Sequence, residues 1–248
     1  MLGNIKGLQD EYRTPTTQEG FAKQWGQNVN MVTSFADGSK VSFEQAIVAN
    51  ALGLTVHKRG MLGQDHDGHV DELTTKYDLD ELRELGGVVD YVVKSCPGPG
   101  VFCLAEHPDA EQQHYLKLFK LGDGPLYSFY TPYHLCHLEV PNTIGRVVDF
   151  ADATGEPLDG PTVEVRAVAK RDLRAGDSLD DYGGYDTYGQ AVARREMAEG
   201  NYLPEGVVLG CKLTRDVAKD EVLTYADVEL PEGRLVDRLR AEQAERFS

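Results

Sequence analysis

The sequence predicts an α+β protein, and three observations lead to this prediction. Helix-capping signals and β-branched strand signals alternate through the first 150 residues. The stretch TGEPLDGP at residues 154–161 interrupts the alternation and is typical of a linker. Beyond it a short pattern recurs at a fixed offset, as in a small β domain. We therefore expect an α+β domain at 1–153, a β domain at 162–231 and a C-terminal helix at 232–248.

Capping signals predict the helices of the first domain. A Thr-x-x-Glu box at residues 16–19 opens a helix that stops near Gly26. A Ser-x-x-Gln box at 42–45 opens the apolar segment FEQAIVANAL, which Gly53 ends. The segment DELRELGG, residues 80–87, reads as a short helix closed by two glycines.

The strand signals of the first domain begin directly after the last of these helices. The segment VVDYVVK, residues 88–94, is apolar and β-branched enough to form an inner strand, and VFCLA at 101–105 is a second candidate. HYLKLFKL and LYSFY are separated by residues 122–125, which predicts a hairpin with a four-residue loop.

Composition restricts the classes of function. A formal charge of −16 argues against a nucleic-acid partner, because phosphate binding requires a basic face. No apolar run is long enough to cross a membrane, and no secretory signal is present, so we expect a cytoplasmic protein. The four cysteines lie far apart without a Cys-x-x-Cys motif, which predicts reduced thiols.

The recurring pattern is the most informative internal feature. Residues 171–181 read RDLRAGDSLDD and residues 215–225 read RDVAKDEVLTY, an offset of 44 residues. Such a pair predicts two strand-turn units that bury their apolar sides against each other, although coincidence between two surface turns is the alternative. At the C-terminus, Leu235, Val236 and Leu239 have helical spacing, which predicts an amphipathic helix that docks on the body or on another subunit.

The repeat, with NYLPEGVVLGCKL between its copies and YADVELPEG after them, resembles a SAF domain, a compact β-clip module, over about residues 163–230. Upstream, GNIKGLQDEYRTPTTQEGFAKQWGQN, SFADGSKVSFEQAIVANALG, KRGMLG, PGPGVF and SFYTPYHLCHLEVP resemble NAD(P)H-dependent oxidoreductases related to homoserine dehydrogenase. That family includes 1-deoxy-D-xylulose 5-phosphate reductoisomerase-like enzymes. The resemblance implies a small phosphorylated or hydroxy/keto substrate.

The resemblance also implies that a Rossmann domain is missing. In such relatives GNIKGL follows the last strand of the nucleotide-binding sheet. No G-x-G-x-x-G motif follows a strand here, because Gly98-Pro99-Gly100 has Cys103 where the third glycine should stand. We therefore expect NADPH or NADH to act only through a missing or partner Rossmann domain. The alternative is a stand-alone, cofactor-free small-molecule binder. An uncovered sheet edge would favour a homo-oligomer.

The densest polar cluster lies in the N-terminal segment. Under the resemblance, Lys6 and Asp10 are the expected catalytic residues, with Lys6 polarising a carbonyl. Asn4 and Arg13 are expected to bind substrate, with Arg13 holding a phosphate bidentately. A solvated loop is the alternative.

Further candidates lie along the chain. Lys40, Lys58 and Arg59 could form an anion cradle beside a helix N-terminus, although turn chemistry explains the preceding Asp37-Gly38 equally well. His134 and Tyr133 are candidate proton donors, with buried core as the alternative; the same segment also has ligand types for zinc, in a spacing that matches no structural zinc pattern.

Two more segments carry open alternatives. His66, His69 and Asp71 have ligand-type side chains for a divalent metal, and an exposed turn is the competing interpretation. The tyrosines in DDYGGYDTYG, residues 180–189, could form a carbohydrate or partner surface or stack within their own loop.

Overall fold

The computed structural model describes residues 1–247, and the chain divides into two compact units. Unit 1 consists of residues 1–8, 47–57 and 61–158. Unit 2 consists of residues 9–46, 58–60 and 159–248. One boundary falls within the predicted linker, whereas the segment 9–46 joins the C-terminal unit, a division that the sequence did not indicate.

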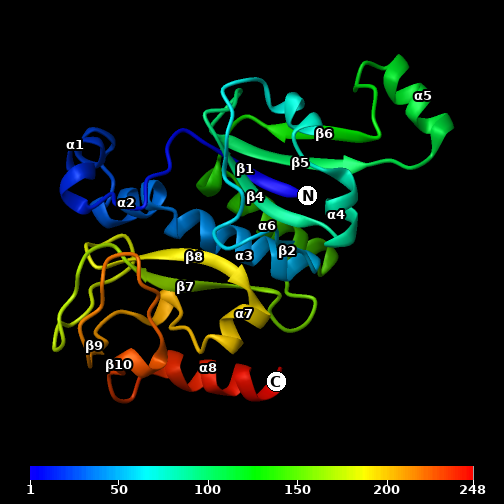
Figure 1. Cartoon of the computed structure of the whole chain (residues 1–248). Helices are drawn as coiled ribbons and strands as arrows, with labels where there is room; N and C mark the ends of the chain where they lie inside the picture. The colour runs from blue at the N-terminus through cyan, green and yellow to red at the C-terminus, as the bar shows by residue number, and fades with distance from the viewer. Residues whose placement is uncertain (248) are drawn as a thin grey trace. The chain divides into compact units, whose positions relative to one another are not determined.

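Unit 1 is built on a six-stranded mixed sheet (Figure 1). Its strand order is β2-β4-β1-β5-β6, and β3 pairs with the far end of β4. β1, β2 and β3 run parallel to β4, β5 is antiparallel to β1, and β6 is antiparallel to β5. The strands are β1 Leu2–Lys6, β2 Thr55–Val56, β3 Gln64–Asp65, β4 Val88–Val93, β5 Gly100–Glu106 and β6 Leu126–Thr131. The predicted α+β class is confirmed.

One face of this sheet is covered by the 3-10 helix η1 (Val70–Thr75) and by α4 (Leu79–Glu84). The strand β4 is buried along its whole length, as its apolar sequence predicts. Asp78, two residues earlier than predicted, caps α4 by accepting hydrogen bonds from two backbone N–H groups. The shared core contains Ile5, Val70, Leu73, Leu82, Val88, Val92, Phe102, Leu104 and Leu126.

The predicted hairpin of HYLKLFKL with LYSFY is wrong. Residues Ala110–Leu118 form helix α5, and β6 pairs with β5 instead. Asp109 accepts a hydrogen bond from the N–H of Gln112 and thereby caps α5. The segment AEQQHYLKL is rich in good helix formers, and none of its residues is buried.

Helix α6 (Cys136–Phe150) follows β6 and has no buried residue. Its apolar side chains are exposed, including Leu138, Val140, Ile144, Val147, Val148 and Phe150. Phe129 on β6 and Val101 on β5, which pair with Cys103 and Thr131, are exposed as well. Unit 1 therefore presents an uncovered apolar surface, which is unusual for a monomer.

Unit 2 begins with helices α1 (Pro15–Trp25) and α2 (Val29–Asp37), which pack against each other, and the first turns of α3 (Ser39–Leu52). Thr14 and Thr17 form the capping box of α1, two residues away from the predicted one. The helix ends at Gly26, as predicted. α3 starts at Ser39, three residues before the predicted box, because Asp37 accepts a hydrogen bond from the Ser39 N–H.

The rest of unit 2 surrounds the β7–β8 hairpin. Its elements are β7 Val163–Ala169, β8 Thr187–Ala193, α7 Arg194–Glu199, η2 Glu205–Val207, β9 Lys212–Leu213, η3 Tyr225–Asp227, β10 Val228–Glu229 and α8 Leu235–Arg246. The C-terminal helix α8 is held by charge rather than by an apolar stripe. Arg240 pairs with buried Glu164 at 2.5 Å, while Leu235 and Leu239 are exposed.

The two copies of the recurring pattern are related by the 44-residue offset, as the sequence predicts. At their centre Leu173 and Val217 exchange two backbone hydrogen bonds of 2.8 and 3.0 Å. The N–H of Leu179 also donates to the carbonyl oxygen of Cys211. The equivalent bond, with the roles of the two copies exchanged, runs from the N–H of Leu223 to the carbonyl oxygen of Ala167. The aliphatic residues of both copies form one buried cluster.

Within residues 1–247, no helix is at once long enough and apolar enough to span a bilayer.

Candidate functional site

The carboxyl ends of the parallel strands meet at one edge of the unit 1 sheet. β1 ends at Lys6, β3 at Asp65 and β4 at Val93, and Lys94 follows directly. Lys6 and Asp65 are both register partners of Val93, so the three residues form one row across the sheet on the same face. Ligands of open α/β sheets bind at this kind of edge.

The second row of this face holds Asn4 and Tyr91, which are register partners on β1 and β4. The Lys6 ammonium lies 6.0 Å from the centroid of the Tyr91 ring, at the outer limit of a cation–π contact. Tyr91 is almost fully buried, whereas Lys6 and Asn4 are half-buried. Lys6 therefore stands at the rim with an aromatic ring behind it.

Lys94 has a backbone conformation that glycine favours, with φ of 71°. Its N–H donates to the carbonyl oxygen of Lys6 at 2.7 Å, and its ammonium contacts Asp65 at 2.6 Å. A non-glycine residue in this conformation costs about 1–2 kcal/mol. The Asp65 pair is more than half exposed, and exposed pairs of this kind contribute about 0–1 kcal/mol. The ion pair therefore does not account for a lysine at this position.

Most other non-glycine residues with positive φ follow helices or turns, where this conformation is common. Lys120, Ala151 and Asn201 come directly after or just beyond helix ends. Lys94 instead ends a buried strand at the ligand edge of the sheet. Backbone strain at such a place is a sign of function.

A buried carboxylate supports the loop that enters this edge. Asp90 on β4 accepts hydrogen bonds from the N–H groups of Leu62 and Gly63, at 3.0 and 2.9 Å, and from the Tyr77 hydroxyl at 2.9 Å. Burial raises the pKa of the Asp90 carboxyl despite these bonds. A Cβ on Gly63 would lie 2.4 Å from the Tyr91 hydroxyl, so the loop approaches Tyr91 closely.

The next loop brings His66 and His69 to the same edge. The His69 ring packs edge-on against Tyr130, with ring centroids 5.5 Å apart, and contacts Asp71 at 3.1 Å. His66 lies 3.6 Å from Glu72. In residues 1–247 no three or more His, Cys, Asp or Glu side chains are grouped so as to hold a metal ion.

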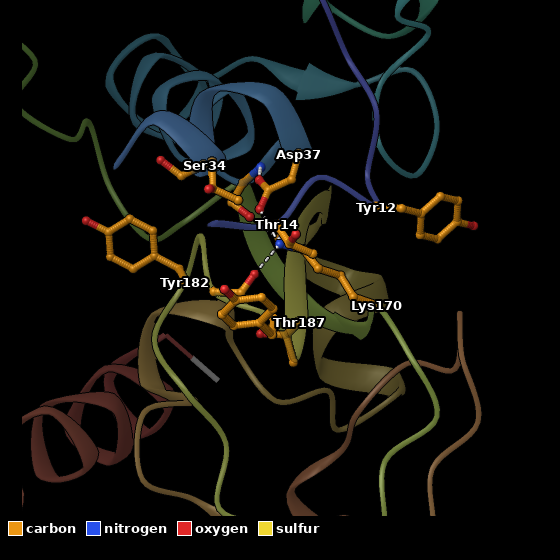
Figure 2. A network of polar contacts seen from close by, with 12 residues as sticks. Tyr12, Thr14, Ser34, Asp37, Lys170, Tyr182 and Thr187 are labelled. Carbon is orange, nitrogen blue, oxygen red and sulfur yellow. Dashed lines mark hydrogen bonds and ion pairs between the residues drawn. The ribbon is translucent and has the colours of Figure 1, made fainter. Parts of the chain in front are cut away.

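Unit 2 has its own buried polar network (Figure 2). Lys170 donates to Asp37 at 2.7 Å and to the carbonyl oxygen of Gly184 at 2.8 Å. The Asp37 and Lys170 side chains point toward each other and are 0% and 2% exposed, so this is a fully desolvated ion pair. It joins α2 to the end of β7, which lie 133 residues apart in the chain.

Glu205 lies in the same interior. Its Oε1 accepts a hydrogen bond from the Thr187 hydroxyl at 3.0 Å, while its Oε2 is buried without a partner. Burial raises the pKa of Glu205 well above the ordinary carboxyl value, and the nearby charge of Asp37 adds to this effect. Burial therefore favours the protonated form of Glu205.

Comparison of the sequence with known protein families gives a match. Residues 1–140 match the family described as "Oxidoreductase DRL, catalytic domain". The chain belongs to this family. The match contains every strand of the six-stranded sheet, with Lys6 and Lys94, and helices α1–α3. Among curated proteins, none matches the sequence.

In this oxidoreductase-related chain the predicted site residues fall into both units. Lys6 and Asn4 lie on β1 of unit 1. Tyr133 and His134 are exposed just after β6, whose end lies at the same edge of the sheet as the end of β1. The structure therefore brings the ends of these two segments to one edge of unit 1.

The remaining predicted residues lie in unit 2 and pair mostly with acids. Arg13 binds Asp10 at 2.8 Å, and Lys40 binds Glu44 at 2.5 Å while lying over the Phe35 ring. Arg59 pairs with Glu196, and Lys58 is exposed. Each of the paired cations therefore has its own carboxylate.

Sequence reasoning missed Lys94 and Asp65 at the sheet edge and Asp90 in the interior of β4. Lys94 was assigned to the end of a strand, and nothing local signals its positive φ. Gly98-Pro99-Gly100 leads into strand β5 rather than into a helix, so it lacks the strand–turn–helix geometry of a dinucleotide-binding turn.

Proposed function

We propose that the carboxyl edge of the unit 1 sheet is the substrate site of an NAD(P)H-dependent oxidoreductase, and that Lys6 binds the substrate's carbonyl oxygen. The family match supports an oxidoreductase role, and the position of Lys6 at the end of β1 carries the assignment to this edge. An ammonium group at this place stabilises negative charge that develops on oxygen during reduction.

The finer assignments belong to the same proposal. A small phosphorylated or hydroxy/keto substrate, a reductoisomerase-like reaction and a SAF-type fold for residues 162–231 follow from the sequence resemblance. The two interlocked turns of unit 2 support the last of these. The nicotinamide cofactor would be held by a Rossmann domain outside these residues, since the Gly98–Gly100 turn does not fit it.

A titration with dihydroxyacetone phosphate tests the proposal. It is a phosphorylated hydroxy-ketone, and glycerol 3-phosphate is the matched probe without the carbonyl. Amide NMR signals of β1 and β4 are expected to respond to both probes, with tighter binding of the ketone. Lys6→Met is expected to abolish this preference, whereas Lys23→Met on the exposed face of α1 leaves it intact. A preference that survives Lys6→Met, or signals confined to unit 2, would refute the assignment.

A cofactor-free binding protein is the second candidate, and the Gly98–Gly100 turn, which leads into strand β5, is compatible with both candidates. Adding NADPH and a separately expressed Rossmann-domain partner to the chain and the ketone distinguishes the two candidates. Oxidation of NADPH, followed at its near-ultraviolet absorbance, supports the oxidoreductase. Ketone binding without NADPH oxidation supports the binding protein.

A further inference from the structure

We propose that Lys94 is the anion-binding residue of the sheet edge and that it takes the phosphate group of the substrate. This inference deepens the proposed function and rests on it for the identity of the ligand. It assigns the phosphate to Lys94 rather than to Arg13, because Lys94 is hydrogen-bonded to Lys6 at the sheet edge, whereas Arg13 belongs to unit 2.

The first argument is position. The hydrogen bond from the Lys94 N–H to the Lys6 carbonyl joins the two lysines at the ends of adjacent parallel strands. Such strands lie about 4.8 Å apart. Both side chains are long and flexible, so one small molecule can contact both ammonium groups.

The second argument is the backbone. Lys94 has φ of 71° at the end of a strand, where glycine or asparagine would be accommodated with less strain. The exposed pair with Asp65 does not offset that strain. A ligand that needs the ammonium group gives a reason for lysine at this position.

The third argument concerns Asp65. Its carboxylate holds the Lys94 ammonium at 2.6 Å, and both side chains are more than half exposed. A phosphate dianion can replace a carboxylate on a lysine, because it offers more acceptor oxygens and more charge. Asp65 therefore positions Lys94 in the free protein and competes with the phosphate for it.

Inorganic phosphate is the probe for the experiment, titrated at constant ionic strength by isothermal calorimetry and by amide NMR. Lys94→Asn is expected to weaken binding about tenfold, because it removes a charge-assisted hydrogen bond. Asp65→Asn is expected to tighten binding about two- to fivefold by removing the competitor. The melting temperature of Lys94→Asn should equal or exceed that of the wild type, since asparagine tolerates this backbone conformation.

Lys120→Asn is the matched control. Lys120 is an exposed lysine of the same unit with φ of 70°, and it follows α5, at the opposite end of the β5–β6 hairpin from the site. Its substitution should leave phosphate binding unchanged. Lys94→Arg should retain binding.

The proposal is overturned if phosphate binds Lys94→Asn as it binds the wild type, or if wild-type protein shows no site that Lys94 affects. A stability loss in Lys94→Asn would assign the lysine a structural role and would count against the proposal too. A different outcome tests the proposed function. If Lys6→Met keeps the preference for the ketone while Lys94→Asn loses phosphate, the anion site stands and the assignment of Lys6 as the carbonyl-binding residue falls.

Discussion

Asp172 and Asp216 each hold the other copy's turn in place. Oδ1 of Asp172 accepts a hydrogen bond from the N–H of Lys219, and Oδ1 of Asp216 accepts one from the N–H of Ala175, both at 2.9 Å. All four positions are related by the 44-residue offset. The two turns are interlocked, so neither copy can form its hydrogen bonds alone.

This reciprocity predicts that Asp172→Ala and Asp216→Ala destabilise the protein by similar, small amounts in urea unfolding. The loss should be somewhat larger for Asp216, because Arg174 also binds its carboxylate at 2.8 Å. Glu232→Ala, at an exposed position, is the control. Markedly unequal effects, with Asp172 the larger, would contradict the symmetric account.

The buried pair of Lys170 with Asp37 predicts that replacing Lys170 alone destabilises the protein far more than replacing both residues. Lys170→Met leaves the Asp37 carboxylate buried without its cation and should lower the free energy of unfolding by about 3–5 kcal/mol. Lys170→Met combined with Asp37→Asn should recover much of that loss. Lys212→Met at an exposed site is the control. Urea denaturation followed by circular dichroism measures all of these variants, and a loss no greater than the control's would show that the pair is dispensable.

The raised pKa of Glu205 predicts that the free energy of unfolding falls as pH rises. Its pKa in the folded state is raised by burial, so between the ordinary carboxyl value and the raised one the folded protein holds a proton that the unfolded chain has released. The free energy of unfolding decreases with pH across that window. Glu205→Gln removes this dependence, so its stability advantage over the wild type should grow with pH above about 4.3.

Thermal melts of both proteins between pH 4 and pH 9 measure this difference, with Glu232→Gln as the control. Parallel curves for the wild type and Glu205→Gln would mean that Glu205 titrates normally. The Asp37, Lys170 and Asp180 charges act on Glu205, and they are present in both proteins.

The hydrogen bonds to Asp90 predict that the stability of the protein depends on an acceptor oxygen at this position rather than on its charge. Asp90→Ala leaves two loop N–H groups and the Tyr77 hydroxyl without their acceptor, and it should cost about 2–5 kcal/mol. Asp90→Asn keeps the oxygen that binds the loop and should cost far less. Hydrogen exchange at Leu62 and Gly63 checks the mechanism, since both amides should lose protection in the alanine variant only.

The exposed side of α6 predicts self-association. Val148 and Leu138 are 75% and 74% exposed on a helix without a buried residue. We expect the wild type to be oligomeric at micromolar concentration by light scattering, and Val148→Asp with Leu138→Asp to shift it toward the monomer. Leu239→Asp, at an exposed leucine of α8, should not do so. A monomeric wild type would contradict this prediction.

The sequence by itself determined the elements whose signals are local. The buried strand at 88–93, the helix ends at Gly26 and Gly53 and the interlocked turns follow from side-chain periodicity, glycine conformation and the 44-residue offset. Such features depend on neighbours within a few residues or on a pattern that occurs twice in the sequence. The position of Lys6 at the end of a strand was not predicted, because the resemblance places GNIKGL after a strand, whereas Leu2–Lys6 form β1.

Only the tertiary structure decided the rest. It paired β6 with β5, whereas the sequence predicts that residues 114–121 pair with the β6 segment. It joined residues 9–46 to the C-terminal unit through Asp37 and Lys170, and it brought Lys94 beside Lys6. These relationships link positions far apart in the chain, and their free energy arises from desolvation and strand pairing that no local pattern records.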